Sequence, residues 1–97
     1  MKILGIREEL EQEIIELAIK YQIKKVIVFG SRARGDYRRT SDIDLAVAGG
    51  NISAFTVDID ELTTTLLEYD IVDLDGSVQK ELLETIKKEG IVVYEKI

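Results

Sequence analysis

The beginning of the chain carries apolar side chains at the spacing of a helix. They recur every three or four positions, at Ile6, Leu10, Ile14, Leu17 and Tyr21. This period places them along one face of an amphipathic helix and leaves the intervening glutamates on a solvated face. The pattern predicts a helix from Ile6 to about Tyr21.

A short apolar run follows and predicts the first strand. Lys24–Phe29 is rich in β-branched residues, as expected of a strand buried on both faces. Gly30 ends this run, since glycine accepts the positive φ angles of tight turns. Ser31 then begins a turn or a short helix, where its hydroxyl and nearby backbone N–H groups are suited to phosphate oxygens.

A second apolar run interleaves acids with hydrophobic residues. Ile43, Leu45 and Val47 form the apolar set, and Asp42 and Asp44 precede and interrupt it. Side chains two apart in a strand lie on the same face, so Asp42 and Asp44 project side by side, with Cα atoms roughly 6.6 Å apart. Two carboxylates at this spacing can share hard divalent cations, and a pair of such ions is what in-line displacement at phosphorus uses.

Apolar residues at helical spacing predict a second helix in the middle of the chain, through Phe55, Ile59, Leu62 and Leu66. Its boundaries are open because Thr63–Thr65 is a poor helix-forming run. Asp58 and Asp60 repeat the Asp-x-Asp spacing here, but side chains two apart diverge on a helix. We expect these acids near the N-terminus of the helix, as capping or dipole partners rather than metal ligands.

The next apolar run, Tyr69–Leu74, predicts a third strand with two candidate carboxylates. Alternation places Asp70 on one face and Asp73 on the other. Only one face can look toward Asp42 and Asp44, so the pattern leaves both acids open as a third ligand.

The end of the chain predicts a helix and a closing strand. Ser77 is a plausible N-cap, Lys87–Lys88 suits the last helical turn, and Gly90 follows as the residue after the C-cap. Ile91–Tyr94 then reads as a strand. The order helix, strand, strand, helix, strand, helix, strand predicts an α/β fold with a mixed sheet of about four strands, because the short connection between the first two strands has no room for a crossover helix.

Composition limits the catalytic residues that are available and indicates the cellular location. The chain has no cysteine and no histidine, which excludes disulfides, thiolate sites and the commonest general base, so catalysis would run on carboxylates and metal. Its 97 residues suit a single domain over 1–97. No apolar stretch approaches the ~20 residues of a membrane span, and no signal sequence is evident, so we expect a cytoplasmic protein without membrane association.

Charge favours a nucleotide over a nucleic acid. A net charge of -6 argues against a broad surface for DNA or RNA. Positive charge nevertheless gathers next to the Gly-Ser turn, where four arginines accompany one acid: Arg32, Arg34, Arg38 and Arg39 with Asp36. A patch of this size beside a phosphate site suits a triphosphate.

Two other phosphate or metal motifs fail on particular residues. A P-loop requires Gly-Lys-Ser or Gly-Lys-Thr, and neither tripeptide occurs in the chain. An EF-hand loop requires an oxygen ligand followed by glycine at positions where this chain has Ala46 and Val47.

The segment instead resembles the minimal nucleotidyltransferases (MNT proteins) of the DNA polymerase β superfamily. The resemblance is carried by Gly30 and Ser31, followed after ten residues by Asp42–Asp44. Tyr69–Asp75 is similar to the family's later strand with a third carboxylate, and Glu89–Glu95 to its closing strand. The resemblance covers most of the chain after its first helix and implies the nucleotidyltransferase fold.

The resemblance also implies magnesium-dependent nucleotidyl transfer from ATP, with two Mg²⁺ ions. The implied catalytic and metal-binding residues are Asp42, Asp44 and Asp70. The implied nucleotide-binding residues are Gly30, Ser31, Arg32 and Arg34. Asp70 best matches the family's acid near the start of the strand, and Asp73 stays as its alternative.

Small MNT proteins that this chain resembles are commonly paired with a helical HEPN toxin, to which they transfer AMP at a tyrosine. On that analogy the chain is the antitoxin of such a pair, and its partner supplies the acceptor. Two alternatives stay open. The chain could be a non-catalytic module that masks its partner by binding, or an enzyme that transfers a nucleotide to a small molecule such as an aminoglycoside.

Overall fold

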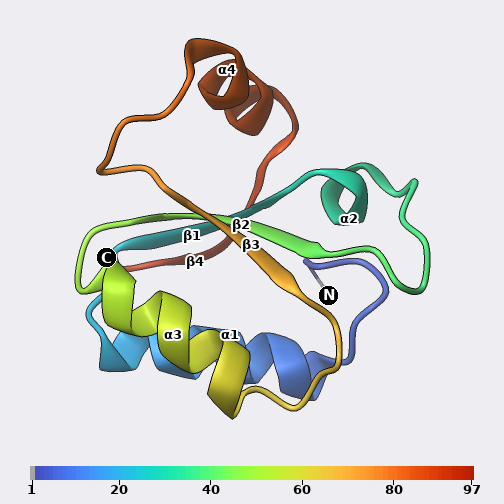
Figure 1. The fold of residues 1–97 in the computed structure, drawn as a ribbon, viewed down its shortest axis with the longest axis horizontal. Coiled ribbons are helices and arrows are strands. Elements are labelled where there is room, and N and C mark those ends of the chain that lie inside the picture. The colour runs from blue at the N-terminus through green and yellow to red at the C-terminus, as the bar shows by residue number, and fades with distance from the viewer. Residues whose placement is uncertain (1) are drawn as a thin grey trace.

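A computed structural model describes residues 2–97, which form one four-stranded sheet with helices on both faces (Figure 1). The helices are α1 (Glu8–Lys20), α2 (Ser31–Arg34), α3 (Ile52–Leu62) and α4 (Lys80–Glu89). The strands are β1 (Lys25–Phe29), β2 (Ile43–Ala48), β3 (Tyr69–Asp73) and β4 (Ile91–Glu95). The predicted α/β fold with a mixed sheet of four strands is confirmed.

The sheet has the strand order β3-β2-β1-β4 and mixed direction. β1 runs antiparallel to both β2 and β4, whereas β2 and β3 run parallel. The antiparallel pair needs only the short α2 connection, while the parallel pair needs a crossover, which α3 supplies. Strands β1 and β2 are therefore central, and their ends are fixed by neighbours on both sides.

The two faces of the sheet are covered unequally (Figure 1). Helices α1 and α3 pack side by side on one face and enclose the main core, which includes Ile14, Val28, Leu45 and Phe55, all with no exposed surface. The short helix α4 alone covers part of the other face, above a small cluster around Phe29, Ala46 and Ile86. The α4 face thus leaves room for polar residues at the ends of the strands.

The first helix is shorter than its apolar pattern. Ile6 is buried but precedes α1, which begins at Glu8, and Tyr21 follows its last residue as the C-cap. The Tyr21 hydroxyl donates a hydrogen bond to the Asp58 carboxylate, which also lies 3.9 Å from the Lys20 ammonium group. These contacts join the end of α1 to α3.

Two predictions for the second helix are wrong. The helix ends at Leu62, and Leu66, expected on its buried face, is fully exposed beyond it. The reason is the threonine run that follows Leu62, whose β-branched side chains favour extended backbone. Asp58 and Asp60 lie in the second half of the helix rather than near its N-terminus, where Asn51 provides the cap by accepting a hydrogen bond from the Ala54 N–H.

The last helix also differs from its prediction at both ends. Gln79, not Ser77, is its N-cap residue, and its side chain makes no capping hydrogen bond. Gly90 caps the C-terminus with extended backbone rather than a left-handed turn. Glycine is required there for space, because a Cβ atom would collide with the Ile86 carbonyl oxygen and lie 2.6 Å from Cγ2 of Ile27. Among residues 2–97, no helix has the length and apolar character to span a bilayer.

The packing of α3 generates a stability prediction. Phe55→Ala should lower the free energy of unfolding by about 3–5 kcal/mol, because Phe55 is fully buried and its removal leaves a cavity between α3 and the sheet. Val57→Ala on the exposed side of the same helix should change it by no more than about 0.5 kcal/mol. Urea denaturation followed by circular dichroism measures both, and equal effects would contradict this account of the core.

Candidate active site

Two acids from neighbouring strands lie side by side on the same face of the sheet. Asp44 of β2 is the register partner of Asp70 of β3, and parallel strands lie about 4.8 Å apart. Ile43 and Leu45 on either side of Asp44 belong to the core beneath α1 and α3. Alternation therefore points Asp44 to the opposite face, the one partly covered by α4. Asp42 precedes β2 by one residue and is exposed at the same end of the strand.

The acids influence one another electrostatically. The pKa of Asp44 is raised, first by burial of its carboxyl group and then by the negative charges of Asp70 and Asp42. The positive charges of Arg34 and Arg32 oppose this shift but do not cancel it. The carboxylates of Asp70 and Asp42 thus lie close enough to Asp44 to raise its pKa, and negative charge gathered in this way favours a cation.

The donor set fits magnesium, although the three acids do not form a closed cluster. Within residues 2–97, no group of three acidic side chains is already gathered around a common point. Carboxylate oxygens on adjacent strands are nevertheless the hard ligands that Mg²⁺ prefers, and Mg²⁺ commonly uses only one or two of them together with phosphate oxygens.

Gly30 makes room for the acid at the centre of this site. Its φ of 74° lies in the left-handed region, and a Cβ atom placed on it would collide with the Asp44 carboxylate. Any side chain here would therefore strain the backbone and displace Asp44. The glycine predicted as a turn residue is also the residue that lets the β1 end approach β2 closely.

The turn continues into the single helical turn α2, which carries Ser31 and Arg34. Ser31 is its first residue and half-buried, and Gly35 ends it in the left-handed conformation. The side chain of Arg34 is 46% exposed and makes ion pairs of 3.3 Å with Asp36 and 3.0 Å with Glu89. Arg34 thus presents a guanidinium group at the surface beside the Gly30–Ser31 turn.

Arg32 does not have the accessible position expected of a phosphate ligand. Its side chain is 1% exposed, and all three guanidinium nitrogens donate to backbone carbonyl oxygens. Nη1 donates to Leu4 at 2.9 Å, and Nε and Nη2 donate to Ser41 at 3.1 and 3.0 Å. The Tyr37 ring stacks on the guanidinium group at 5.1 Å. Arg32 therefore joins the N-terminal segment to the loop before β2, and of the two arginines only Arg34 is exposed beside the turn.

Glu89, at the end of α4, is a further residue of the site that the sequence analysis missed. Its Oε1 accepts a hydrogen bond of 3.0 Å from the Gly30 backbone N–H and one of 3.0 Å from Arg34. One local signal pointed to it. An acid in the last turn of a helix opposes the helix dipole, whereas Lys87 and Lys88 beside it complement the dipole.

Asp73, the alternative third acid, lies away from Asp44. It is the register partner of Val47, a core residue, and three positions from Asp70. Its Oδ1 accepts a hydrogen bond of 2.9 Å from the Asp75 N–H, which stabilises the turn after β3. Of the two candidates, Asp70 is therefore the acid beside Asp44.

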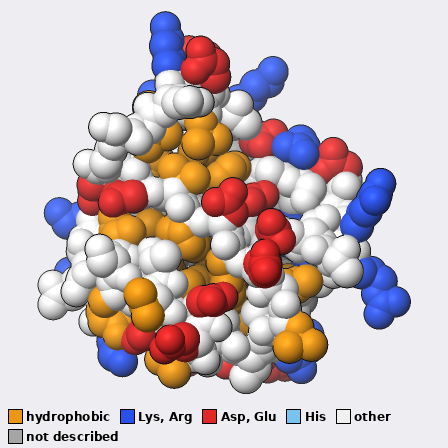
Figure 2. All heavy atoms as spheres, viewed as in Figure 1, with side chains coloured by type: hydrophobic (Ala, Val, Ile, Leu, Met, Phe, Trp, Pro, Cys, Tyr) orange, Lys and Arg blue, Asp and Glu red, His pale blue; other side chains and the backbone are white. Residues whose placement is uncertain are grey.

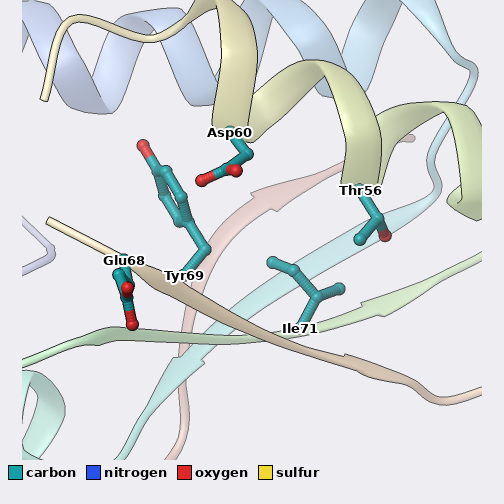
Figure 3. A pocket seen from close by; sticks show the side chains of 5 residues that line it. All are labelled: Thr56, Asp60, Glu68, Tyr69 and Ile71. Carbon is teal, nitrogen blue, oxygen red and sulfur yellow. The ribbon is translucent and has the colours of Figure 1, made fainter. Parts of the chain in front are cut away.

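A hollow in the surface lies on the other face of β3 from these acids (Figure 3). It has a volume of about 310 Å³ and lies between α3, which contributes Thr56 and Asp60, and β3, which contributes Tyr69 and Ile71. Because Tyr69 and Ile71 point toward α3, Asp70 between them points away from the hollow.

Figure 2 shows acidic side chains gathered over the middle of the visible face and the basic ones around its rim.

The fold agrees with comparisons to known proteins. Residues 12–97 match the family described as Polymerase beta, Nucleotidyltransferase. The match covers most of the chain, and the chain belongs to this family. It is therefore a nucleotidyltransferase in class, as its resemblance to the minimal nucleotidyltransferases implies.

One sequence relative and two solved structures are similar to most of this chain. A protein of Methanocaldococcus jannaschii, provisionally named protein adenylyltransferase MJ0604, is 37% identical over 90 residues, which cover 80% of this chain and 87% of that protein. A toxin–antitoxin crystal structure with AMP-PNP superposes with a TM-score of 0.70 at 26% identity, covering 89% of this chain and 73% of that chain. A structure provisionally described as a minimal nucleotidyltransferase gives a TM-score of 0.64 at 30% identity, covering 84% and 86%.

The buried guanidinium group generates a second prediction. Arg32→Lys should lower the free energy of unfolding by at least about 2 kcal/mol, because a single ammonium nitrogen does not reproduce the planar fork whose separate nitrogens donate to the carbonyls of Leu4 and Ser41. Arg39→Lys, at an exposed position of the same loop, is the matched control and should have little effect. Urea denaturation of both variants measures the difference, and a wild-type midpoint for Arg32→Lys would show that the buried contacts do not stabilise the loop.

The raised pKa of Asp44 generates a third prediction, for protein in buffer with EDTA. Because the pKa of Asp44 is raised in the folded state, its protonated carboxyl stabilises the fold relative to the ionised form. This contribution is fully present below the ordinary aspartate pKa of about 3.9 and is lost as pH rises through the pKa of the folded state. Asp44→Asn removes this loss, so the variant should be more stable than the wild type at pH 7.

The stability difference for Asp44→Asn should shrink as pH falls toward 4. Urea denaturation across that range measures it, with Asp60→Asn on α3 as a control that lies on the opposite face of the sheet. A variant that is less stable than the wild type at pH 7 would contradict the proposed repulsion at Asp44.

Proposed function

We propose that this chain is a magnesium-dependent protein adenylyltransferase that transfers AMP from ATP to a tyrosine of a partner protein. The observation that carries the proposal is the apposition of Asp44 and Asp70 next to Gly30. The relative named for protein adenylyltransfer and the toxin–antitoxin structure with a bound ATP analogue support it.

Each residue of the site has a role in this reaction. Asp42, Asp44 and Asp70 hold Mg²⁺, which when bound neutralises charge on the triphosphate. Asp70 also orients the attacking tyrosine hydroxyl and accepts its proton. The tyrosine oxygen forms a bond to the α-phosphorus, the bond from the α-phosphorus to the bridging oxygen breaks, and pyrophosphate leaves with the electron pair.

The phosphates of ATP lie along the turn between β1 and α2. The hydroxyl of Ser31 donates to their oxygens, and so does the backbone N–H of Gly30, which donates to Glu89 in the absence of ATP; the Arg34 guanidinium adds positive charge at the surface. Arg32 contributes through the loop that it fixes rather than through a contact with phosphate, since its donors are already used by carbonyl oxygens.

The acceptor is supplied by another protein. The helices and strands of residues 2–97 form one sheet with its covering helices, which leaves little structure in the described part of the chain for a second substrate. The toxin–antitoxin structures that superpose on this chain support a toxin as the partner. We propose a helical toxin of the HEPN type, with this chain as its antitoxin.

Transfer of labelled AMP tests the proposal directly. The chain should transfer label from α-labelled ATP to a tyrosine of the co-expressed toxin when Mg²⁺ is present and not when EDTA is added. Asp44→Asn should reduce the rate by roughly 10²–10³-fold, because several kcal/mol of transition-state stabilisation depend on the metal. Mass spectrometry of the toxin identifies the modified residue.

The chain contains a matched control for this experiment. Asp60→Asn changes the second Asp-x-Asp pair, on α3, and should leave the rate close to that of the wild type. Full activity of Asp44→Asn would overturn the site. If the toxin is inhibited without being labelled, the chain is not acting as an enzyme but as a module that inhibits its partner through binding alone.

A further inference from the structure

Glu89 occupies an unfavourable place on α4 for an acid. It is the last residue of the helix, where the unpaired carbonyl groups carry partial negative charge and where lysines occupy the two preceding positions. Its side chain is 18% exposed, so it is also partly removed from water. A carboxylate in this position needs donors from elsewhere in the fold.

Those donors come from the turn proposed to hold phosphate. Oε1 of Glu89 lies 3.0 Å from the backbone nitrogen of Gly30 and 3.0 Å from Nη1 of Arg34, and Oε2 lies 3.2 Å from the same Nη1. A backbone N–H and a guanidinium group converging on one anionic oxygen are the contacts that a phosphate oxygen also receives.

The same donors cannot serve Glu89 and a phosphate fully at once. The backbone N–H of Gly30 has one hydrogen to donate, and Glu89 accepts it. Arg34 is pulled toward Glu89 through Nη1 and toward Asp36 through Nε, so two of its three nitrogens face acids of the chain. A triphosphate that enters the turn must compete with these acids and above all with Glu89, which contacts both donors.

We propose that Glu89 is an internal phosphate mimic that sets the affinity of the site for the triphosphate of its nucleotide. With no nucleotide, its carboxylate holds Gly30 and Arg34 and keeps α4 against the end of β1. A triphosphate displaces it and takes over both donors. This inference rests on the proposed function, because it assigns the Gly30–Arg34 turn to nucleotide phosphates.

The nearly isosteric variant Glu89→Gln separates the charge of this side chain from its shape. The amide oxygen can still accept from Gly30 and from Arg34, but the negative charge that attracts Arg34 is lost. Glu84→Gln is the matched control, since it removes one acid from an exposed position on the same helix. Thermal unfolding followed by circular dichroism checks that both variants are folded.

Calorimetric titration of the chain alone with AMP-PNP and, separately, with inorganic tripolyphosphate, both with Mg²⁺, measures the effect. Glu89→Gln should bind both about two- to fivefold more tightly than the wild type, the range expected for release of one partly exposed ion pair, and adenosine should show no such gain. The gain should shrink at high salt. Glu84→Gln should bind like the wild type.

A double-mutant cycle tests whether the effect passes through Arg34. Arg34→Ala should weaken binding of tripolyphosphate, and adding Glu89→Gln to it should bring little of the gain seen in the wild-type background. A full gain in that background would overturn the role assigned to this pair.

The remaining outcomes separate this inference from the proposed function. Unchanged or weaker binding by folded Glu89→Gln would overturn the inference alone and make Glu89 a support for the turn. Absence of triphosphate binding by both wild type and variant would overturn it together with nucleotide binding. Because no acceptor protein is used, failure of AMP transfer to the toxin would leave the result of this titration standing.

Discussion

Repulsion among like charges at the start of strands β2 and β3 is the constraint on which the site depends. Asp44 is partly buried and faces Asp70 across a parallel strand pair, with Asp42 close enough to raise its pKa further. Such an arrangement destabilises the protein by itself and becomes favourable when positive charge is supplied. The rest of the fold can be understood as the frame that holds these acids together despite their repulsion.

This frame consists of the central strands of the sheet on one side and the turn after β1 on the other. The central strands β1 and β2 are held by the core beneath α1 and α3, which fixes the backbone position of Asp44. Gly30 leaves the space that its carboxylate occupies. Arg32 fixes the loop before β2 from inside by donating to carbonyl oxygens of two distant segments.

The two arginines near the acids differ in their positions, since Arg32 is buried and Arg34 lies at the surface. Arg32 and Arg34 are two residues apart in a single helical turn, yet one is buried and saturated with hydrogen bonds while the other is exposed and paired with acids. Glu89 reaches this turn from a helix more than fifty positions later in the chain. The charge of the turn is therefore governed by a residue whose position depends on how α4 packs.

The sequence by itself determined the helices and strands and the class of protein. Period-two and helical spacing predicted every strand and long helix to within a few residues, because both patterns are local and record which side of an element meets the core. Asp42, Asp44 and the Gly30–Ser31 turn could be recognised for the same reason, since their spacing lies within one connection. Element ends such as Ser77 and Leu66 were predicted less well, because caps depend on a few contacts.

Only the tertiary structure decided which distant residues meet. The register of β2 with β3 selected Asp70 over Asp73, since a strand presents alternate residues to opposite faces and alternation alone does not say which face is which. Burial assigned Arg32 to the interior, and the packing of α4 brought Glu89 to Gly30. These outcomes depend on contacts between segments far apart in the chain, which no local spacing encodes.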